Sequence, residues 1–236
     1  MVSGVLDLLI GLVNRDVTQA VDYFYANDVQ RQIVQTKVTA INETKAQALF
    51  DKYKKGAVID EDQVFEFYKD LGIDMETDIV TFMFSYNMQV KDKQLVMGEY
   101  TKEEFIQGCK NLGVDDLAGW KAKTATMRAD LKNDNKFKEM YKFVFGFACE
   151  KGMKSVDIDT ALALWPTLLG NRCKFMDKWV KFIQEKQGKK EITIMTKDTW
   201  DLFFDLVQQT GGDWSKFEDD GAWPVLIDGF VEYMAK

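Results

Sequence analysis

The sequence predicts a mainly helical, all-α fold, and three observations support this. Only two of the 236 residues are proline, Pro166 and Pro224, so long helices are possible. Along most of the chain, apolar residues recur every three or four positions, which is the spacing of one buried helix face. Apolar residues make up 46% and charged residues 29% of the sequence, which is enough for a sizeable core and a polar surface.

The N-terminal residues predict two short helices, at 4–13 and 16–26. Asp16 is a suitable N-cap for the second helix, whose apolar positions share one face. A polar connector follows at about 28–42 and is the best candidate for a domain boundary. We therefore expect a helical segment at 1–30, a linker at 31–42 and the main domain at 43–236.

The first half of the main domain predicts two degenerate EF-hand-like helix-loop-helix units with very short strands. Helices are expected near 43–55, 61–71, 76–90 and 101–112. Short extended pieces at 57–59 and 95–97 each precede an acid-capped helix. Asp60 with Glu61 caps one helix, and Thr101 with its capping-box partner Glu104 caps the other.

The second half predicts a C-terminal helical lobe. Apolar faces of helical period occur within 137–148, 158–169 and 175–183, and a brief alternation at 191–195 predicts a strand. The next helix, 196–209, should end at Gly211-Gly212. A last helix should start near Trp223, with Pro224 at its first position. Because apolar residues surround most of its circumference, we expect this helix to be largely buried.

Residue types argue against catalysis, a metal site or a bound cofactor. The chain has no histidine, which is the commonest general base and metal ligand. Its three cysteines, Cys109, Cys149 and Cys173, are far apart, and each lies in an apolar stretch of a predicted helix, so buried thiols are expected. There is no Walker loop, no GxGxxG after a strand and no GxSxG. A thiol enzyme that uses Cys109 stays open as an alternative.

The loop at 51–62, DKYKKGAVIDED, raises the possibility of calcium binding. Asp51 at position 1 and Gly56 at position 6 fit a calcium loop. Tyr53 and Lys55 stand at positions 3 and 5, where oxygen ligands belong, and Asp62 replaces the bidentate Glu of position 12. The sequence thus disfavours calcium, although an EF-hand-like calcium-binding protein remains an alternative reading.

Negative charge is concentrated near the C-terminus. From residue 198 onward there are nine acids and two lysines, giving 2 − 9 = −7, which equals the net charge of the whole chain. Such an acidic surface attracts a basic protein and argues against nucleic acid as the partner. A generic acidic adaptor for some other basic protein would fit this charge distribution as well. Lys174, Lys178 and Lys181 line one predicted helix face and are expected to be solvated.

Targeting signals are not evident. The apolar N-terminus lacks a basic region and contains Asp7, and the second residue is Val2, which does not fit myristoylation. No stretch approaches the ~20 apolar residues that span a bilayer. We expect no membrane association and a cytoplasmic or nuclear location.

The segment DTWDLFFDLVQQTGGDWSKFEDDGAWPVLIDGFVEYM, 198–234, resembles the C-terminal signature of the defective-in-cullin-neddylation family, the PONY domain. Weaker similarity at 101–114, 137–148 and 168–183 extends it over about 43–235. The resemblance implies a non-catalytic scaffold-type co-ligase for cullin neddylation. Its expected partners are the cullin C-terminal winged-helix domain, the neddylation conjugating enzyme and the cullin RING subunit. An acidic patch of Asp198, Ala222 and Asp228 is expected to bind the cullin.

The resemblance also implies an apolar pocket for the acetylated N-terminus of the conjugating enzyme. The matching positions are Val64, Phe84, Ser85, Met88 and Tyr100, although this chain has extra residues around 74–98. Residues 14–28 are similar to the last helix of a UBA-like domain. Too little chain precedes them for its three helices, so ubiquitin binding is left open and a small docking helix is an equal alternative.

Overall fold

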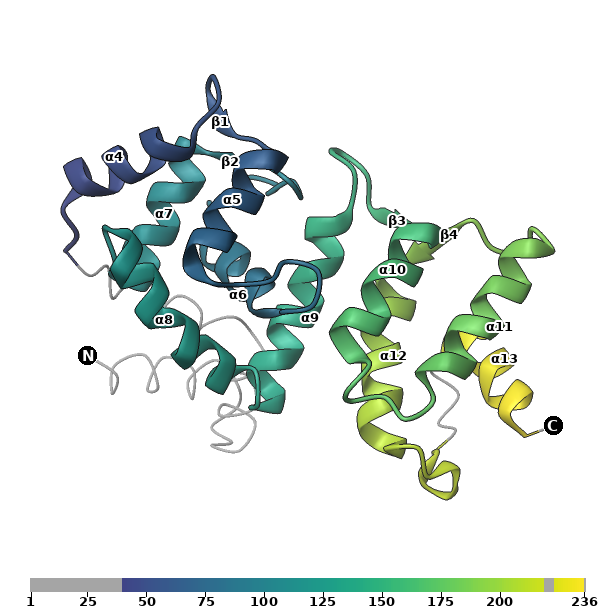
Figure 1. Ribbon diagram of the computed structural model, residues 1–236. Coiled ribbons are helices and arrows are strands. Elements are labelled where there is room, and N and C mark those ends of the chain that lie inside the picture. Colours follow the sequence, from purple (N-terminus) through teal and green to yellow (C-terminus); the bar gives the residue numbers. More distant parts are fainter. Residues whose placement is uncertain (1–39, 219–222, 236) are drawn as a thin grey trace, which may run out of the picture. The chain divides into compact units, whose positions relative to one another are not determined.

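The computed structural model describes residues 40–218 and 223–235 (Figure 1). The chain divides into two units, Met1–Ala40 and Ile41–Lys236, and nearly all described residues belong to the second. The helices predicted at 4–13 and 16–26, the UBA-like similarity and most of the linker lie outside the described residues.

The first half of the Ile41–Lys236 unit contains two helix-loop-helix units followed by an additional helix. Antiparallel pairing of β1 with β2, in which Val58 faces Thr101 and Ile59 faces Tyr100, joins the loops of the two units. This arrangement confirms the EF-hand-like outline. The elements are α4 (Glu43–Tyr53), β1 (Val58–Ile59), α5 (Glu61–Leu71), α6 (Val80–Asn87), β2 (Tyr100–Thr101), α7 (Lys102–Leu112) and α8 (Leu117–Asp130).

The predicted caps of α5 and α7 are confirmed. The Asp60 carboxylate accepts the backbone N–H of Gln63 at 3.2 Å. At α7, the Thr101 N–H donates to the Glu104 carboxylate at 2.7 Å, and the Glu104 N–H donates to the Thr101 hydroxyl at 3.4 Å. Each reciprocal bond satisfies a backbone donor that the helix itself cannot pair.

Two boundaries in this half were predicted wrongly. The helix expected at 76–90 begins only at Val80, because the Asp74 and Asp78 side chains accept the N–H groups of Glu76 and Val80 and hold turns there. The extended piece expected at 95–97 is not a strand. The residues that pair with β1 lie further on, at Tyr100–Thr101.

Helix α8 was not predicted. Only Trp120, Thr124 and Met127 form its buried face, and the rest of the helix is rich in Ala, Lys and Thr. That face carries too few apolar residues to give a clear helical period. Asp116 caps the helix by accepting the N–H of Gly119 at 2.8 Å.

The second half of the unit is the predicted C-terminal helical lobe, with one small sheet. In this sheet β3 and β4 are antiparallel and Val156 faces Met195. The strand predicted at 191–195 is present but lies slightly later, and β3 was missed. The elements are α9 (Asp134–Ala148), β3 (Ser155–Asp157), α10 (Ile158–Leu169), α11 (Met176–Gly188), β4 (Ile194–Thr196), α12 (Lys197–Thr210), the 3-10 turn η1 (Trp214–Lys216) and α13 (Val225–Met234).

A continuous hydrophobic core fills both halves. In the C-terminal lobe, the rings of Trp179 and Phe203 stack at 4.1 Å. The indole N–H of Trp165 donates to the Tyr141 hydroxyl at 3.0 Å, and that hydroxyl donates to the Trp200 carbonyl at 2.9 Å. Buried polar groups of this kind fix the packing of the helices that carry them.

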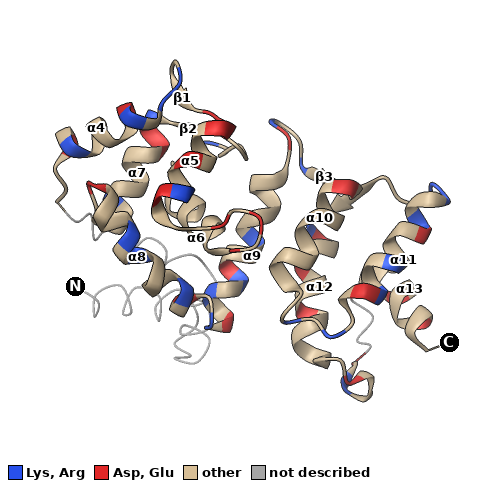
Figure 2. Ribbon diagram, viewed as in Figure 1, with Lys and Arg blue, Asp and Glu red and all other residues tan. Residues whose placement is uncertain are grey.

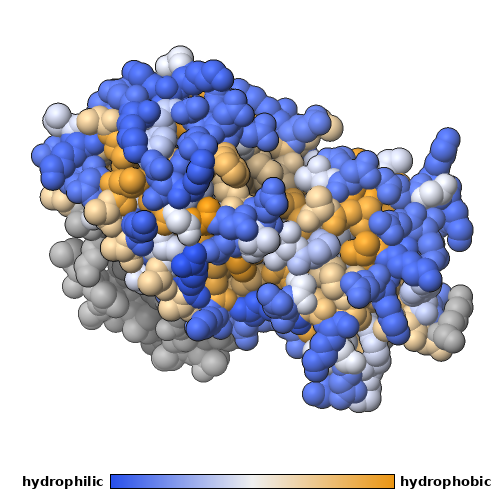
Figure 3. Space-filling model, in the orientation of Figure 1, coloured by the Kyte–Doolittle hydropathy of each residue, from blue (hydrophilic) through white to orange (hydrophobic). Residues whose placement is uncertain are grey.

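On the face seen in Figure 3, hydrophobic surface shows in several patches, one of them between α10 and α11, and hydrophilic side chains cover much of the rest. Within residues 40–218 and 223–235, no helix has both the length and the apolar character that crossing a bilayer requires.

The prediction for the last helix was partly wrong. Pro224 is the N-cap, with extended backbone (ψ 143°), so the helix begins at Val225. Only Ile227 and Phe230 are buried, and the Val225 side chain is 88% exposed. Helix α13 packs on α11 and α12, and its other apolar residues are partly buried against the core: Leu226, Val231, Tyr233 and Met234.

Candidate functional site

Asp198 lies in the first turn of α12 and is exposed. The Thr196 hydroxyl caps this helix by accepting the N–H of Thr199 at 3.3 Å. Trp200 and Phe203 on the same helix are buried and face the core. The helix therefore holds the Asp198 carboxylate on the solvent side, where the N-terminal end of the helix dipole favours a negative charge.

Asp228 also lies in the first turn of its helix, α13, and is exposed. Its N–H donates to the Pro224 carbonyl at 3.1 Å, which is the first hydrogen bond of the helix. Phe230 anchors the helix against Trp179, with ring centroids 5.0 Å apart. Because α12 and α13 are in contact, both carboxylates belong to neighbouring helices of one lobe.

Ala222, the middle residue of the expected cullin patch, lies outside the described residues. Described residues on either side of its segment are tied to each other. The Trp223 indole N–H donates to the Glu218 carbonyl at 3.0 Å, and the rings of Phe217 and Trp223 lie 5.6 Å apart. Glu218 and Trp223, which flank the segment that contains Ala222, thus lie close together.

The acids of the C-terminal lobe fall into two groups. Asp205 pairs with Lys138 of α9 and Asp201 pairs with Lys197, and both acids are partly buried. Asp198, Asp228 and Glu232 are exposed and form no salt bridge with any described residue. Figure 2 shows acidic positions on α12 and α13, and α13 carries no basic residue. The exposed group can therefore receive cations from another molecule.

The five residues expected to form the pocket for the conjugating enzyme come together, but as core. The Ser85 and Tyr100 hydroxyls lie 2.6 Å apart, and the Tyr68 and Tyr100 hydroxyls lie 3.1 Å apart. Burial raises the pKa of both tyrosines. All five side chains are at most 2% exposed: Val64, Phe84, Ser85, Met88 and Tyr100. A ligand could enter only if these side chains moved, so the pocket assignment stays a prediction.

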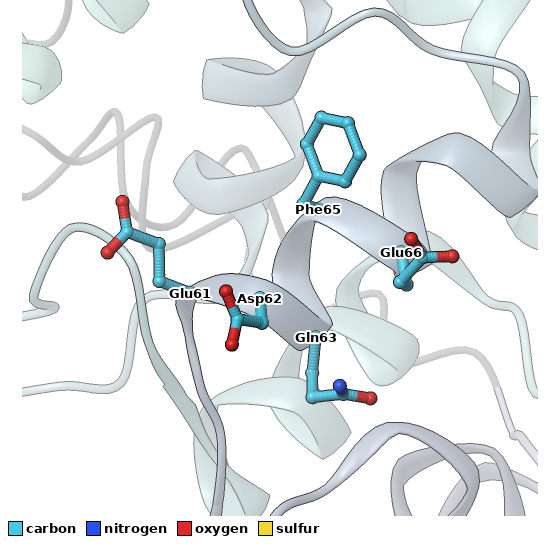
Figure 4. A pocket seen from close by; sticks show the side chains of 5 residues that line it. All are labelled: Glu61, Asp62, Gln63, Phe65 and Glu66. Carbon is cyan, nitrogen blue, oxygen red and sulfur yellow. The ribbon is translucent and has the colours of Figure 1, made fainter.

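Open surface does exist on α5, the helix that carries Val64. A shallow hollow of about 450 Å³ is lined by Glu61, Asp62, Gln63, Phe65 and Glu66 (Figure 4). The Phe65 side chain is 49% exposed. The exposure of Phe65 was not predicted, although the buried positions 64, 67, 68 and 71 define a helix face that leaves Phe65 outside.

The acids of the 51–62 loop are engaged by lysines. Asp51 pairs with Lys54 at 2.6 Å, and Lys55 lies 3.3 Å from Asp60 and 3.7 Å from Asp62. In the part of the chain that the structure describes, no group of three or more Cys, Asp or Glu side chains is arranged to hold a metal ion. Lysine ammonium groups thus occupy the space around the carboxylates that a calcium ion would need.

The three cysteines are buried, as expected. Burial raises the pKa of the Cys109 thiol to about 12, and the pKa of the Cys173 thiol likewise to about 12. A nucleophilic cysteine needs a thiolate near neutral pH. These two thiols are therefore protonated packing groups. Lys178 and Lys181 are exposed on α11, as expected of a solvated face.

Comparison with known proteins identifies the family. A family model described as "Cullin binding" matches residues 119–233, which include α12 and α13. DCN1-like protein 3 of Homo sapiens is 32% identical over 195 residues, covering 80% of this chain and 62% of the human protein. DCN1-like protein 3 of Xenopus tropicalis shows the same identity and coverage.

DCN1-like protein 5 of Bos taurus is 30% identical over 168 residues, covering 71% of this chain and 67% of the bovine protein. The chain thus spans somewhat less than two thirds of the DCN1-like 3 proteins and two thirds of the DCN1-like 5 protein. The similarity includes the helices that carry Asp198 and Asp228. On this evidence, the chain belongs to the defective-in-cullin-neddylation family.

Proposed function

We propose that this protein is a non-catalytic accessory factor that promotes cullin neddylation by binding a cullin and the neddylation conjugating enzyme together. The observation that carries the proposal is the pair of exposed carboxylates, Asp198 and Asp228, on two helices in contact. They lie inside the region that matches the cullin-binding family model. A basic surface of the cullin C-terminal domain is the partner that fits them.

The proposed mechanism is proximity. Two partners that bind one rigid body meet at a high effective concentration and in a restricted orientation. The continuous core between the two halves of the unit supplies that rigidity. The cullin would bind the C-terminal lobe while the conjugating enzyme binds the EF-hand-like half, so no residue of this chain has to exchange a proton or form a covalent bond.

The contact with the conjugating enzyme is proposed at the face formed by α5, α6 and β2. Support comes from the hollow on α5, where Phe65 offers an exposed aromatic ring. A Phe65→Ala variant should weaken binding of the conjugating enzyme and leave binding of a cullin fragment unchanged. Equal binding of the enzyme by both proteins would place that contact elsewhere.

The test of the proposed function is a neddylation assay combined with a binding assay. The cullin C-terminal fragment should bind the wild-type protein, and binding should weaken as salt rises because exposed charges are screened. Adding the protein should accelerate cullin modification by the conjugating enzyme. Absence of binding at low salt, or no acceleration despite binding of both partners, would refute the proposal. We further propose that the protein acts in the cytoplasm or the nucleus, which localisation of a tagged protein would test.

A further inference from the structure

One face of α13 is exposed along its whole length and has a distinct composition. Val225, Asp228 and Glu232 occur at i, i+3 and i+7, so they share one side of the helix. All three are exposed, and the Val225 side chain is 88% exposed. Ile227 and Phe230 on the opposite side are fully buried. The helix is thus firmly seated and presents a fixed row of side chains to solvent.

Val225 is the anomalous member of this row. Among the described residues it is the most exposed of the large hydrophobic side chains, ahead of Met153 at 55% and Ile194 at 52%. Its position is set by the N-cap Pro224, whose extended backbone turns the chain into the helix. An apolar side chain held at the end of a row of acids has little to contact within this chain. It can gain stabilisation by being buried against another molecule.

Charge along the row is negative and uncompensated by described residues. Asp228 and Glu232 are four residues apart, about one helical turn, and neither forms a salt bridge with a described residue. Like charges at this spacing repel each other weakly, so the isolated helix gains nothing from them. Opposing cations from a partner would relieve that repulsion and pair with both carboxylates.

We infer that the Val225–Asp228–Glu232 row of α13 is a docking strip for a protein surface that presents one apolar side chain beside two basic ones. The inference rests on the proposed function, because Asp228 is the residue expected to contact the cullin. It adds Val225 as an apolar anchor and Glu232 as a second carboxylate. Acids alone would bind any cationic surface, whereas the apolar anchor selects partners that carry a matching apolar group.

The experiment measures binding of a cullin C-terminal fragment by calorimetry for variants of the full chain. Val225→Ala should weaken binding about fifteenfold, since each buried CH₂ contributes roughly a fourfold factor and Val loses two carbons. Glu232→Gln should weaken it up to about fivefold and flatten the dependence on salt. Neither change should alter thermal stability, because both side chains are exposed.

Matched controls come from the EF-hand-like half. Met97→Ala removes another exposed apolar side chain, and Glu99→Gln neutralises another exposed acid. Both should bind the cullin fragment like the wild type. If the wild type binds and Asp228→Lys abolishes binding, but Val225→Ala and Glu232→Gln bind normally, the docking strip is refuted while the proposed function stands. No binding by the wild type would overturn both.

Discussion

Reversing the charge of Asp198 or Asp228 should abolish cullin binding without unfolding the domain. Both carboxylates are exposed, and neither has a salt bridge with a described residue that the change would break. Each lies in the first turn of a helix, so Lys there would meet the positive end of the helix dipole. That effect costs about 0.3–1 kcal/mol, a small part of the total stability of a domain of this size.

The loss of affinity should be much larger than the loss of stability. A hydrogen bond to a charged group contributes about 1.5–3 kcal/mol, so Asp228→Asn should weaken binding about tenfold or more. Asp228→Lys replaces attraction by repulsion of similar size, which raises the loss to about 3–6 kcal/mol, a factor of a hundred or more. The Asn and Lys variants should therefore form a graded series at each position.

Calorimetric titration with the cullin fragment and thermal unfolding should be measured on the same protein samples. Glu61→Lys is the matched control, because Glu61 is also an exposed acid in the first turn of a helix, α5. This control should bind the fragment normally. Unchanged affinity in both Asp198→Lys and Asp228→Lys would refute the assignment of the patch. If a variant that loses binding also showed no cooperative thermal unfolding, its loss of binding would be an effect of misfolding.

Three further predictions follow from the described contacts. Cys109, with its pKa raised to about 12 by burial, should resist iodoacetamide at pH 8 in the folded protein and react once unfolded. Asp157→Ala should cost about 1 kcal/mol in a denaturant titration, because α10 loses its N-cap. Since the Thr160 hydroxyl lowers the pKa of Asp157, this difference should be complete above the ordinary value of 3.8 and vanish as pH falls through the lowered pKa. Phe230→Ala should cost about 3–5 kcal/mol and also weaken cullin binding, because α13 loses its anchor.

Local signals in the sequence were sufficient for much of the fold. The capping box of Thr101 and Glu104 predicted the start of α7, and Gly211 ends α12 with a left-handed φ of 54°. Both signals depend on short-range hydrogen bonds and backbone geometry, which neighbouring residues determine. Strand positions were harder to predict from the sequence than helix ends. β2 is defined by pairing with β1, some forty residues earlier, and such pairing leaves no pattern within a two-residue strand.

The acidic residues of the candidate site could be predicted from the sequence, but the exposure of the side chains around them was harder to predict. The acid count pointed to the segment from residue 198 onward, and the family resemblance pointed to Asp198 and Asp228 within it, both of which are exposed. The exposure of Val225 was missed because apolar residues occupy most of the circumference of α13, which predicted a largely buried helix. Burial depends on the neighbours of a helix, and α13 packs on α11 and α12. The spacing of Val225 from Asp228 and Glu232, which puts all three on one side of the helix, was the signal that could have shown this exposure.

A charge-swap experiment asks whether Asp198 and Asp228 pair directly with basic residues of the cullin. Basic residues of the cullin C-terminal fragment would be replaced by Asp one at a time, and each variant titrated with wild-type protein and with Asp228→Lys. At least one acidic cullin variant, which binds the wild type poorly, should regain affinity for Asp228→Lys, since the opposite charges again face each other. If no cullin variant regains affinity for either Asp228→Lys or Asp198→Lys, these carboxylates do not pair with the cullin.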